Sequence, residues 1–159
     1  YAVGRSKGKD PKIKDFYKLL SAHYKNKVKK PLFPKEFFAQ ILAQKVGEIM
    51  LIKINGKVVS GMLQLCHGNT VYDYYVFGLD TQYPNNYPSV LVYWETIKRA
   101  SAHGYTTFDT MGAGIPGQAY GVRDFKLRFG SHLVEHGRFL SINKPLLYKL
   151  GTLAIKLIS

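Results

Sequence analysis

The chain has 159 residues, of which 46% are apolar and 14% aromatic, which is enough to bury the core of one domain and excludes a disordered chain. Lys and Arg number 23 against 10 Asp and Glu, and the net charge of +13 favours phosphate-bearing partners such as RNA, nucleotides or anionic lipid. A single cysteine, Cys66, excludes both an internal disulfide and a cysteine-built zinc site.

The first nine residues differ in composition from the rest of the chain. Residues 1–9 are polar and rich in Gly and Lys, and we expect them to form a flexible lead-in to a single domain over residues 10–159. The chain begins with Tyr1 and has no apolar signal-peptide segment there, so we expect it to be a piece of a longer protein. It also has no run of about 18 apolar residues, so no transmembrane helix is predicted.

Two helices are predicted before the first strand. Asp10 and Pro11 have the pattern of an N-cap and a first helical residue, and apolar side chains then recur at helical spacing as far as Tyr24. The run from Lys25 to Lys30 is a basic loop, and Pro34 begins the second helix.

Three strands in a meander follow. The segments 49–54, 58–67 and 70–79 are short and rich in β-branched and aromatic residues. The dipeptides Asn55-Gly56 and Gly68-Asn69 between them are typical of tight turns, so we expect the three strands to be antiparallel.

The rest of the chain alternates helices with short strands. In order, we expect a helix at 89–103, a strand at 105–109, a helix at 118–129, a strand at 132–140 and a helix at 145–158. The first of these helices is expected to bury a stripe of Leu91, Trp94, Ile97 and Ala100. The last helix is amphipathic and basic; its apolar side is expected to pack in the core, with an anionic membrane surface as the alternative.

Several short sequence blocks follow one another between about residues 15 and 130. They are D-F-Y-K-L-L at 15–20, P-L-F-P-K-E-F-F at 31–38, I-K-I-N-G-K-V-V-S-G at 52–61, Y-D-Y-Y at 72–75, P-N-N at 84–86, F-D at 108–109 and F-K-L-R-F-G at 125–130. With the order of the elements, they resemble the Fem-like branch of the GNAT acyltransferase fold, which builds peptidoglycan interpeptide bridges. The resemblance implies an α/β (α+β) domain, a mixed and mostly antiparallel twisted sheet flanked by helices, and a chain that is the second of two GNAT-like halves.

The resemblance also implies an activity. A Fem-like enzyme moves an activated acyl group, here most simply an aminoacyl group from tRNA, to an amine of a peptidoglycan or other cell-envelope precursor. It needs no resident cofactor, because aminoacyl-tRNA or acyl-CoA is a co-substrate. A lipid-linked acceptor would bring peripheral membrane contact, so the expected location is the cytoplasm, at the inner face of the membrane. An isolated half is expected to bind weakly and to turn over nothing alone.

Lys126, in the F-K-L-R-F-G block, is the first candidate catalytic residue. In the Fem-like family the lysine of this motif lies in the active-site region, and we expect its ammonium group to stabilise charge on the transferring carbonyl or on a phosphate. Arg123 and Arg128 flank it as candidate phosphate ligands, with a solvated basic helix face as the alternative. Asp109 is the second catalytic candidate, because carboxylates at strand ends commonly face ligands; it would orient the amine or hold Lys126, or else only cap the following loop.

The Tyr-rich strand and the loop after it supply the remaining candidates for substrate binding. Side chains alternate across the faces of a strand, and we expect Asp73 and Tyr75 to share the face that lines the cleft. Asn85 and Asn86 precede a helix N-terminus, where backbone N–H groups can receive a phosphate or carboxylate; an ordinary cap loop is the alternative. The five histidines show no metal-binding spacing, so no metal is expected.

Two glycine patterns bear on the acyl donor. The acetyl-CoA loop of ordinary GNAT enzymes, Q/R-x-x-G-x-G/A, should follow the Tyr-rich strand and is absent there, which argues against acetyl-CoA. Residues 112–117 match the dinucleotide pattern G-x-G-x-x-G, but antiparallel strands precede them and Pro116 removes an N–H, so no dinucleotide is expected. Two alternatives stay open: an acetyl-CoA-dependent N-acetyltransferase, and a non-catalytic basic module that binds RNA or an anionic envelope lipid.

Overall fold

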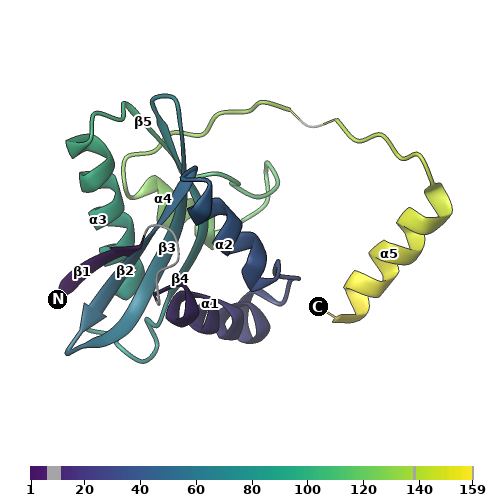
Figure 1. The fold of residues 1–159 in the computed structure, drawn as a ribbon. Coiled ribbons are helices and arrows are strands. Elements are labelled where there is room, and N and C mark those ends of the chain that lie inside the picture. Colours follow the sequence, from purple (N-terminus) through teal and green to yellow (C-terminus); the bar gives the residue numbers. More distant parts are fainter. Residues whose placement is uncertain (7–11, 138, 159) are drawn as a thin grey trace.

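A five-stranded sheet with helices on both faces forms the body of the molecule (Figure 1). The computed structural model describes residues 1–6, 12–137 and 139–158. In chain order, the elements are β1 (Ala2–Ser6), α1 (Lys12–His23), the π-helical turn η1 (Tyr24–Val28), α2 (Lys35–Ala43), β2 (Gly47–Ile54), β3 (Lys57–His67), β4 (Thr70–Gly78), α3 (Pro88–Ala102), β5 (Thr107–Asp109), α4 (Gly121–Leu127) and α5 (Pro145–Ile158). This mixed, mostly antiparallel sheet flanked by helices is the predicted fold class.

The strands pair in the order in which they occur in the sequence. The pairs β1–β2, β2–β3 and β3–β4 are antiparallel, and β5 adds to β4 in parallel. Asn55 and Gly56 join β2 to β3 with φ values of 49° and 78°, left-handed conformations that Asn and Gly adopt at low cost. The predicted meander is confirmed.

The N-terminal residues belong to the sheet. Ala2–Ser6 pairs along β2, and the Tyr1 hydroxyl donates a hydrogen bond of 2.5 Å to Glu95 of α3. The expected lead-in over residues 1–9 is therefore wrong for residues 1–6. The free edge of β2 presents unpaired N–H and C=O groups, and a polar segment can satisfy them as well as an apolar one can.

One face of the sheet packs against α1 and α2. Phe16 and Leu20 of α1 and Phe38 of α2 are fully buried on it, at the helical spacing that the sequence predicts. Gly61 of β3 makes the close approach possible, because a Cβ there would lie 2.9 Å from Phe16 and 2.8 Å from Phe77.

The opposite face packs against α3, with a different stripe from the predicted one. Only Ala100 of the predicted stripe is buried, and Trp94 is 51% exposed. The buried side chains are Val92, Tyr93, Thr96 and Ala100, with Pro88 at the start of the helix. The helix carries two neighbouring apolar stripes, and the prediction is wrong because packing against the sheet selects the one that contains Tyr93.

The predicted ends of several segments need correction. The expected helix at 118–129 is only α4, because Gly121 begins the helix and the residues before it form a loop. Residues 132–137 and 139–140 form no strand, since they have no neighbouring strand to pair with among the described residues. The predicted N-cap of α1, Asp10 with Pro11, lies outside the described residues.

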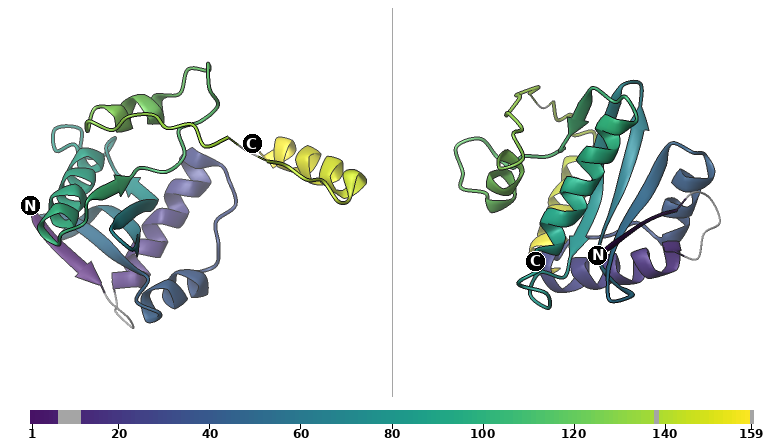
Figure 2. Two further views of the ribbon diagram at one scale, coloured as in Figure 1. Left: turned by 90° about the horizontal axis from the view of Figure 1, so that it is seen from above. Right: turned by 90° about the vertical axis from the view of Figure 1, so that its left-hand side faces the viewer.

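The last helix, α5, forms where it is predicted but stands away from the body. A long connection leads from α4 to α5, which lies apart in Figure 1 and in the left-hand view of Figure 2. Its apolar side chains are exposed, Leu146 by 75% and Leu157 by 87%, so the expectation that they pack in the core is wrong. Among the residues that the structure describes, no helix combines the length and apolar character needed to cross a lipid bilayer.

Candidate functional site

Three side chains from three different elements meet in a buried polar cluster. Asp73 of β4 accepts a hydrogen bond from the hydroxyl of Tyr93 of α3, and its Oδ2 lies 3.9 Å from Nζ of Lys126 of α4. The exposed fractions are 5% for Asp73, 2% for Tyr93 and 8% for Lys126. A carboxylate, a phenol and an ammonium group withdrawn together from water are typical of a functional site.

Aromatic rings hold this cluster in place. The ring of Tyr93 stacks on Phe129 at 5.2 Å between centroids and meets Phe125 edge-on at 5.1 Å. Both phenylalanines belong to the F-K-L-R-F-G block, so the block's aromatic residues dock α4 against α3 and thereby bring Lys126 to Asp73.

Burial shifts the proton equilibria of all three groups. It raises the pKa of Asp73, while the hydrogen bond from Tyr93 and the charge of Lys126 oppose that rise. Burial lowers the pKa of Lys126, against the attraction of Asp73 and Asp109. Burial and the negative charge of Asp73 also raise the pKa of Tyr93, which therefore stays protonated as a donor.

A bulge in β4 separates Asp73 from Tyr75. Leu63 of β3 pairs with Tyr75 and the next residue, Gln64, pairs with Asp73, so Tyr74 is the extra residue. Tyr75 consequently lies on the α1–α2 face, where its ring is 5.1 Å from Phe38. The expectation that Asp73 and Tyr75 share one face is wrong, because simple alternation does not hold across a bulge.

Lys126 also anchors the loop that follows β5. Its Nζ donates to the carbonyl of Thr110 and, at 3.1 Å, to that of Gly112. Asp109 accepts a hydrogen bond of 2.7 Å from the backbone N–H of Met111, so its carboxylate caps this loop, and its charge acts on Lys126 from nearby. The structure thus brings both catalytic candidates, Lys126 and Asp109, to the same loop.

The two arginines take different positions. The guanidinium of Arg123 donates to the carbonyls of Ala113 and Ile115, each at 3.4 Å, and to that of Gln118. Arg123 therefore holds the glycine loop through backbone carbonyls of that loop. Arg128 ends α4 and is exposed to solvent.

A carboxylate covers the N-terminus of α3. Asp80 accepts a hydrogen bond of 3.0 Å from the backbone N–H of Ser89 and one of 2.5 Å from its hydroxyl. Asn85 and Asn86 are exposed in the loop just before the helix. The helix N-terminus therefore already has an anionic partner, which is the cap-loop alternative with Asp80 as the capping residue.

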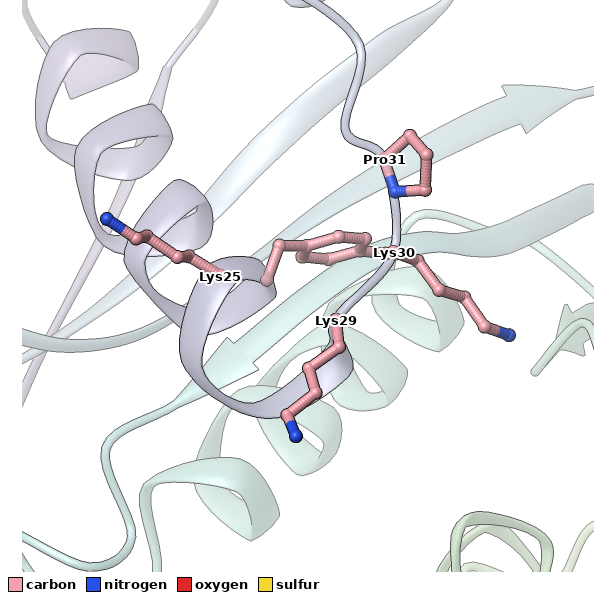
Figure 3. Close-up of a pocket in the computed structure, with 5 residues that line it drawn as sticks. Lys25, Lys29, Lys30 and Pro31 are labelled. Atoms are coloured by element: carbon pink, nitrogen blue, oxygen red, sulfur yellow. The ribbon is translucent and has the colours of Figure 1, made fainter. Parts of the chain in front are cut away.

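A basic hollow lies beside η1 (Figure 3). It has a volume of about 350 Å³ and is lined by Tyr24, Lys25, Lys29, Lys30 and Pro31. Figure 3 shows the three lysine side chains extending outward in different directions, so that their ammonium groups point away from one another. Lys29 has a left-handed φ of 54°, which directs the chain around this turn.

Tyr24 lines the hollow and also contacts the Tyr-rich strand β4. Its ring is 5.7 Å from that of Tyr75, and burial, followed by the nearness of Tyr75 and Asp73, raises the pKa of Tyr24 to about 12. Tyr120, at the start of α4, acts electrostatically on both Tyr24 and Tyr93. Tyr24 and Tyr93 are therefore both within electrostatic range of Asp73 and Tyr120.

Sequence reasoning did not single out Tyr93, Tyr24 or Asp80. Tyr93 is separated by three and seven residues from Thr96 and Ala100, a spacing that could have indicated a buried helix face with polar members. Asp80 lies nine residues before Ser89, a distance at which no local capping pattern is visible. Within residues 1–6, 12–137 and 139–158, no three His, Cys, Asp or Glu side chains gather closely enough to hold a metal ion.

Comparison with known proteins identifies the family. The sequence profile described as "Acetyltransferase (GNAT) domain" matches residues 5–127, a range that includes the whole Asp73–Tyr93–Lys126 cluster. No curated protein matches the chain.

Solved structures share the fold at low sequence identity. An aminoglycoside acetyltransferase from an uncultured soil metagenomic sample, in complex with sisomicin, is 17% identical over 89% of this chain and 96% of its own, with a TM-score of 0.62. A ribosomal-protein-alanine N-acetyltransferase from Brucella melitensis biovar Abortus 2308 is 9% identical over 89% of this chain and 100% of its own, with a TM-score of 0.64. The chain belongs to the acetyltransferase (GNAT) domain family and is an acyltransferase of the GNAT type.

Proposed function

We propose that this acyltransferase takes its acyl group from a carrier other than acetyl-CoA, and that the carrier is aminoacyl-tRNA, as in the Fem-like enzymes that the chain resembles. The acceptor is an amine of a peptidoglycan or other cell-envelope precursor. The observation that carries the proposal is the carboxylate of Asp80 at the N-terminus of α3.

Asp80 stands where ordinary GNAT enzymes have their acetyl-CoA loop, between the Tyr-rich strand and the next helix. A helix N-terminus binds phosphate through free backbone N–H groups and the positive end of the helix dipole. Here the Ser89 N–H is bonded to the Asp80 carboxylate, whose charge would also repel a pyrophosphate. The missing Q/R-x-x-G-x-G/A motif and this cap support the same inference.

The lysine-lined hollow offers a different place for a polyanion. Lys25, Lys29 and Lys30 are exposed, and among the described residues no carboxylate lies within salt-bridge distance of them. Three exposed ammonium groups without a carboxylate partner among the described residues suit the phosphodiester backbone of a tRNA acceptor end.

The proposed reaction needs positioning and charge stabilisation rather than a covalent intermediate. The acceptor amine attacks the carbonyl of the aminoacyl ester, the C–N bond forms and the C–O bond to the tRNA breaks. The proton lost by the amine ends on the departing ribose hydroxyl. Lys126 would stabilise the negative charge that develops on the carbonyl oxygen, and the buried site would strengthen that interaction by excluding water.

Acetyl-CoA-dependent N-acetylation is the second candidate, because the family description names acetyl transfer. Calorimetric titrations with acetyl-CoA and with tRNA carrying a non-hydrolysable aminoacyl linkage separate the two. We expect saturable binding of the tRNA and none of acetyl-CoA. Saturable binding of acetyl-CoA would overturn the proposal.

Variants that lack selected lysines test whether the hollow itself is the binding site for tRNA. Changing Lys25, Lys29 and Lys30 together to Gln should weaken tRNA binding at least tenfold, while the same change at Lys14, Lys45 and Lys57 removes equal charge outside the hollow. If both triple variants lose affinity equally, tRNA binds through net charge alone and the hollow is not its site.

A further inference from the structure

We propose that α5 is an interfacial anchor that binds the surface of an anionic lipid bilayer. The inference is independent of the acyl donor and rests on how this helix distributes its side chains.

The residues of α5 divide into a narrow polar strip and a broad apolar face. Lys149, Thr152 and Lys156 are spaced by three and four residues and therefore lie along one line of the helix. The large apolar side chains of the broad face are Leu146, Leu147, Leu150, Leu153 and Leu157, each between 57% and 87% exposed. In the part of the chain that the structure describes, these five leucines belong to neither hydrophobic core cluster of the body.

The charges near this face have one sign. Lys144 precedes α5, Lys149 and Lys156 lie within it, and the chain contains no Asp or Glu after Glu135. A face edged only by positive charge is complementary to a surface of negative charge, and an anionic bilayer presents a single negative sign. The charge of α5 therefore complements a lipid surface.

The shape of the helix fits the same partner. Its 14 residues give a length of roughly 21 Å, shorter than a hydrocarbon core of about 30 Å, and the lysine strip along its side would remain at the level of the headgroups if the helix lay in the plane of the interface. An apolar face this broad exceeds what one partner helix covers, but half-immersion in the headgroup region buries all of it. Tyr148, next to the polar strip, has the amphipathic ring that favours this depth.

Vesicle flotation with the intact chain tests the proposal. We expect binding to vesicles of phosphatidylcholine mixed with phosphatidylglycerol to exceed binding to phosphatidylcholine alone by roughly tenfold to a hundredfold, because each lysine near the surface adds to the attraction. Equal binding to the two kinds of vesicle, or none to either, would overturn the proposal.

Two aspartate substitutions distinguish binding through the apolar face of α5 from binding through its net positive charge. Leu150→Asp puts a charge in the middle of the apolar face and should reduce binding at least tenfold. Thr152→Asp adds the same charge two residues away on the polar strip and should reduce it only a few-fold. Both positions are on the helix that stands apart, so thermal unfolding of the body should be the same in both variants.

A second copy of the chain is the competing partner for the apolar face, and light scattering without vesicles tests for it. A dimer that Leu150→Asp dissociates and Thr152→Asp leaves intact would assign the apolar face to a second copy of the chain and would overturn the proposal. A monomer whose vesicle binding follows the expected order of the two variants supports it.

Discussion

Lys126 and Asp73 hold opposite charges in a place where neither would be stable alone. Burial favours the neutral form of each group, and each opposes that tendency in the other. Tyr93 supplies a hydrogen bond to the carboxylate, and two backbone carbonyls receive bonds from the ammonium group. The site therefore maintains a cation beside the proposed reaction centre at the cost of desolvation, an arrangement suited to stabilising developing negative charge.

Replacing Lys126 should affect catalysis in a pH-dependent way. We expect Lys126→Met to lower kcat by on the order of 100-fold or more, and Lys126→Arg to retain more activity because it keeps the charge. Only the ammonium form stabilises an oxyanion, and burial lowers the pKa of Lys126, so wild-type activity should fall with rising pH before lysine's ordinary value is reached.

The alkaline fall in activity should be absent in Lys126→Arg, since arginine does not titrate there. Single-turnover transfer rates over a pH series measure both effects, with Lys57→Met as an exposed control. An activity that rises through the lowered pKa would make the lysine a general base instead and contradict the electrostatic role.

Tyr93→Phe removes the donor to Asp73 and should destabilise the fold by about 1–3 kcal/mol at neutral pH. Loss of the hydrogen bond raises the pKa of Asp73 further, so the variant favours the protonated carboxyl more strongly than the wild type does. The loss of stability should accordingly be larger at pH values above this pKa and smaller below it.

Urea unfolding at several pH values measures this dependence, with the exposed Tyr87→Phe as control. A loss of stability that stays constant with pH would show that Tyr93 acts by packing alone.

At the scale of elements, two local irregularities shape the site. The bulge at Tyr74 places Asp73 on the face that packs against α3 and Tyr75 on the opposite face, beside Phe38 of α2. The Asp80 cap fixes the start of α3, the helix that carries Tyr93. Changing either irregularity should therefore alter how the side chains of the Asp73–Tyr93–Lys126 cluster are placed.

Asp80→Ala should lower the free energy of unfolding by about 1 kcal/mol, as the loss of a helix cap does. His23 provides a second readout. Burial and then Lys27 lower its pKa, and Asp80 partly restores it, so the variant should lower the pKa of His23 further. Chemical denaturation and NMR titration measure the two effects, and Thr81→Ala in the same loop should change neither. An unchanged His23 titration would contradict the position assigned to Asp80.

At the scale of the whole molecule, positive charge is concentrated near the proposed ligands. If the hollow binds a nucleic acid backbone, affinity should fall with salt, and the logarithmic slope should decrease by about 0.7 for each phosphate contact removed. The variant with Gln at positions 25, 29 and 30 should therefore show a slope smaller by about 2 than that of the wild type. Fluorescence titrations of tRNA over a salt series measure this slope, and an unchanged slope would place the phosphate contacts elsewhere.

Much of this protein is determined locally by its sequence. The turns at Asn55-Gly56 and Gly68-Asn69 fix the meander, because Asn55, Gly56 and Gly68 adopt left-handed conformations at low cost and short apolar runs flank both turns. The spacing of Phe16 and Leu20 fixes the buried side of α1 in the same way. The F-K-L-R-F-G block likewise carries, next to Lys126 in the sequence, the two phenylalanines that pack on Tyr93.

Only the tertiary structure decided the features that depend on distant neighbours. The bulge at Tyr74 exists in the pairing with β3, the Asp80 cap joins residues nine apart, and Tyr93 is buried because the sheet selects one of two stripes on α3. Among the described residues, 132–137 and 139–140 have no partner strand, and Leu146 and Leu157 of α5 have no place in the core. Local conformational preference acts within a few residues, whereas burial and pairing depend on what the rest of the chain brings alongside.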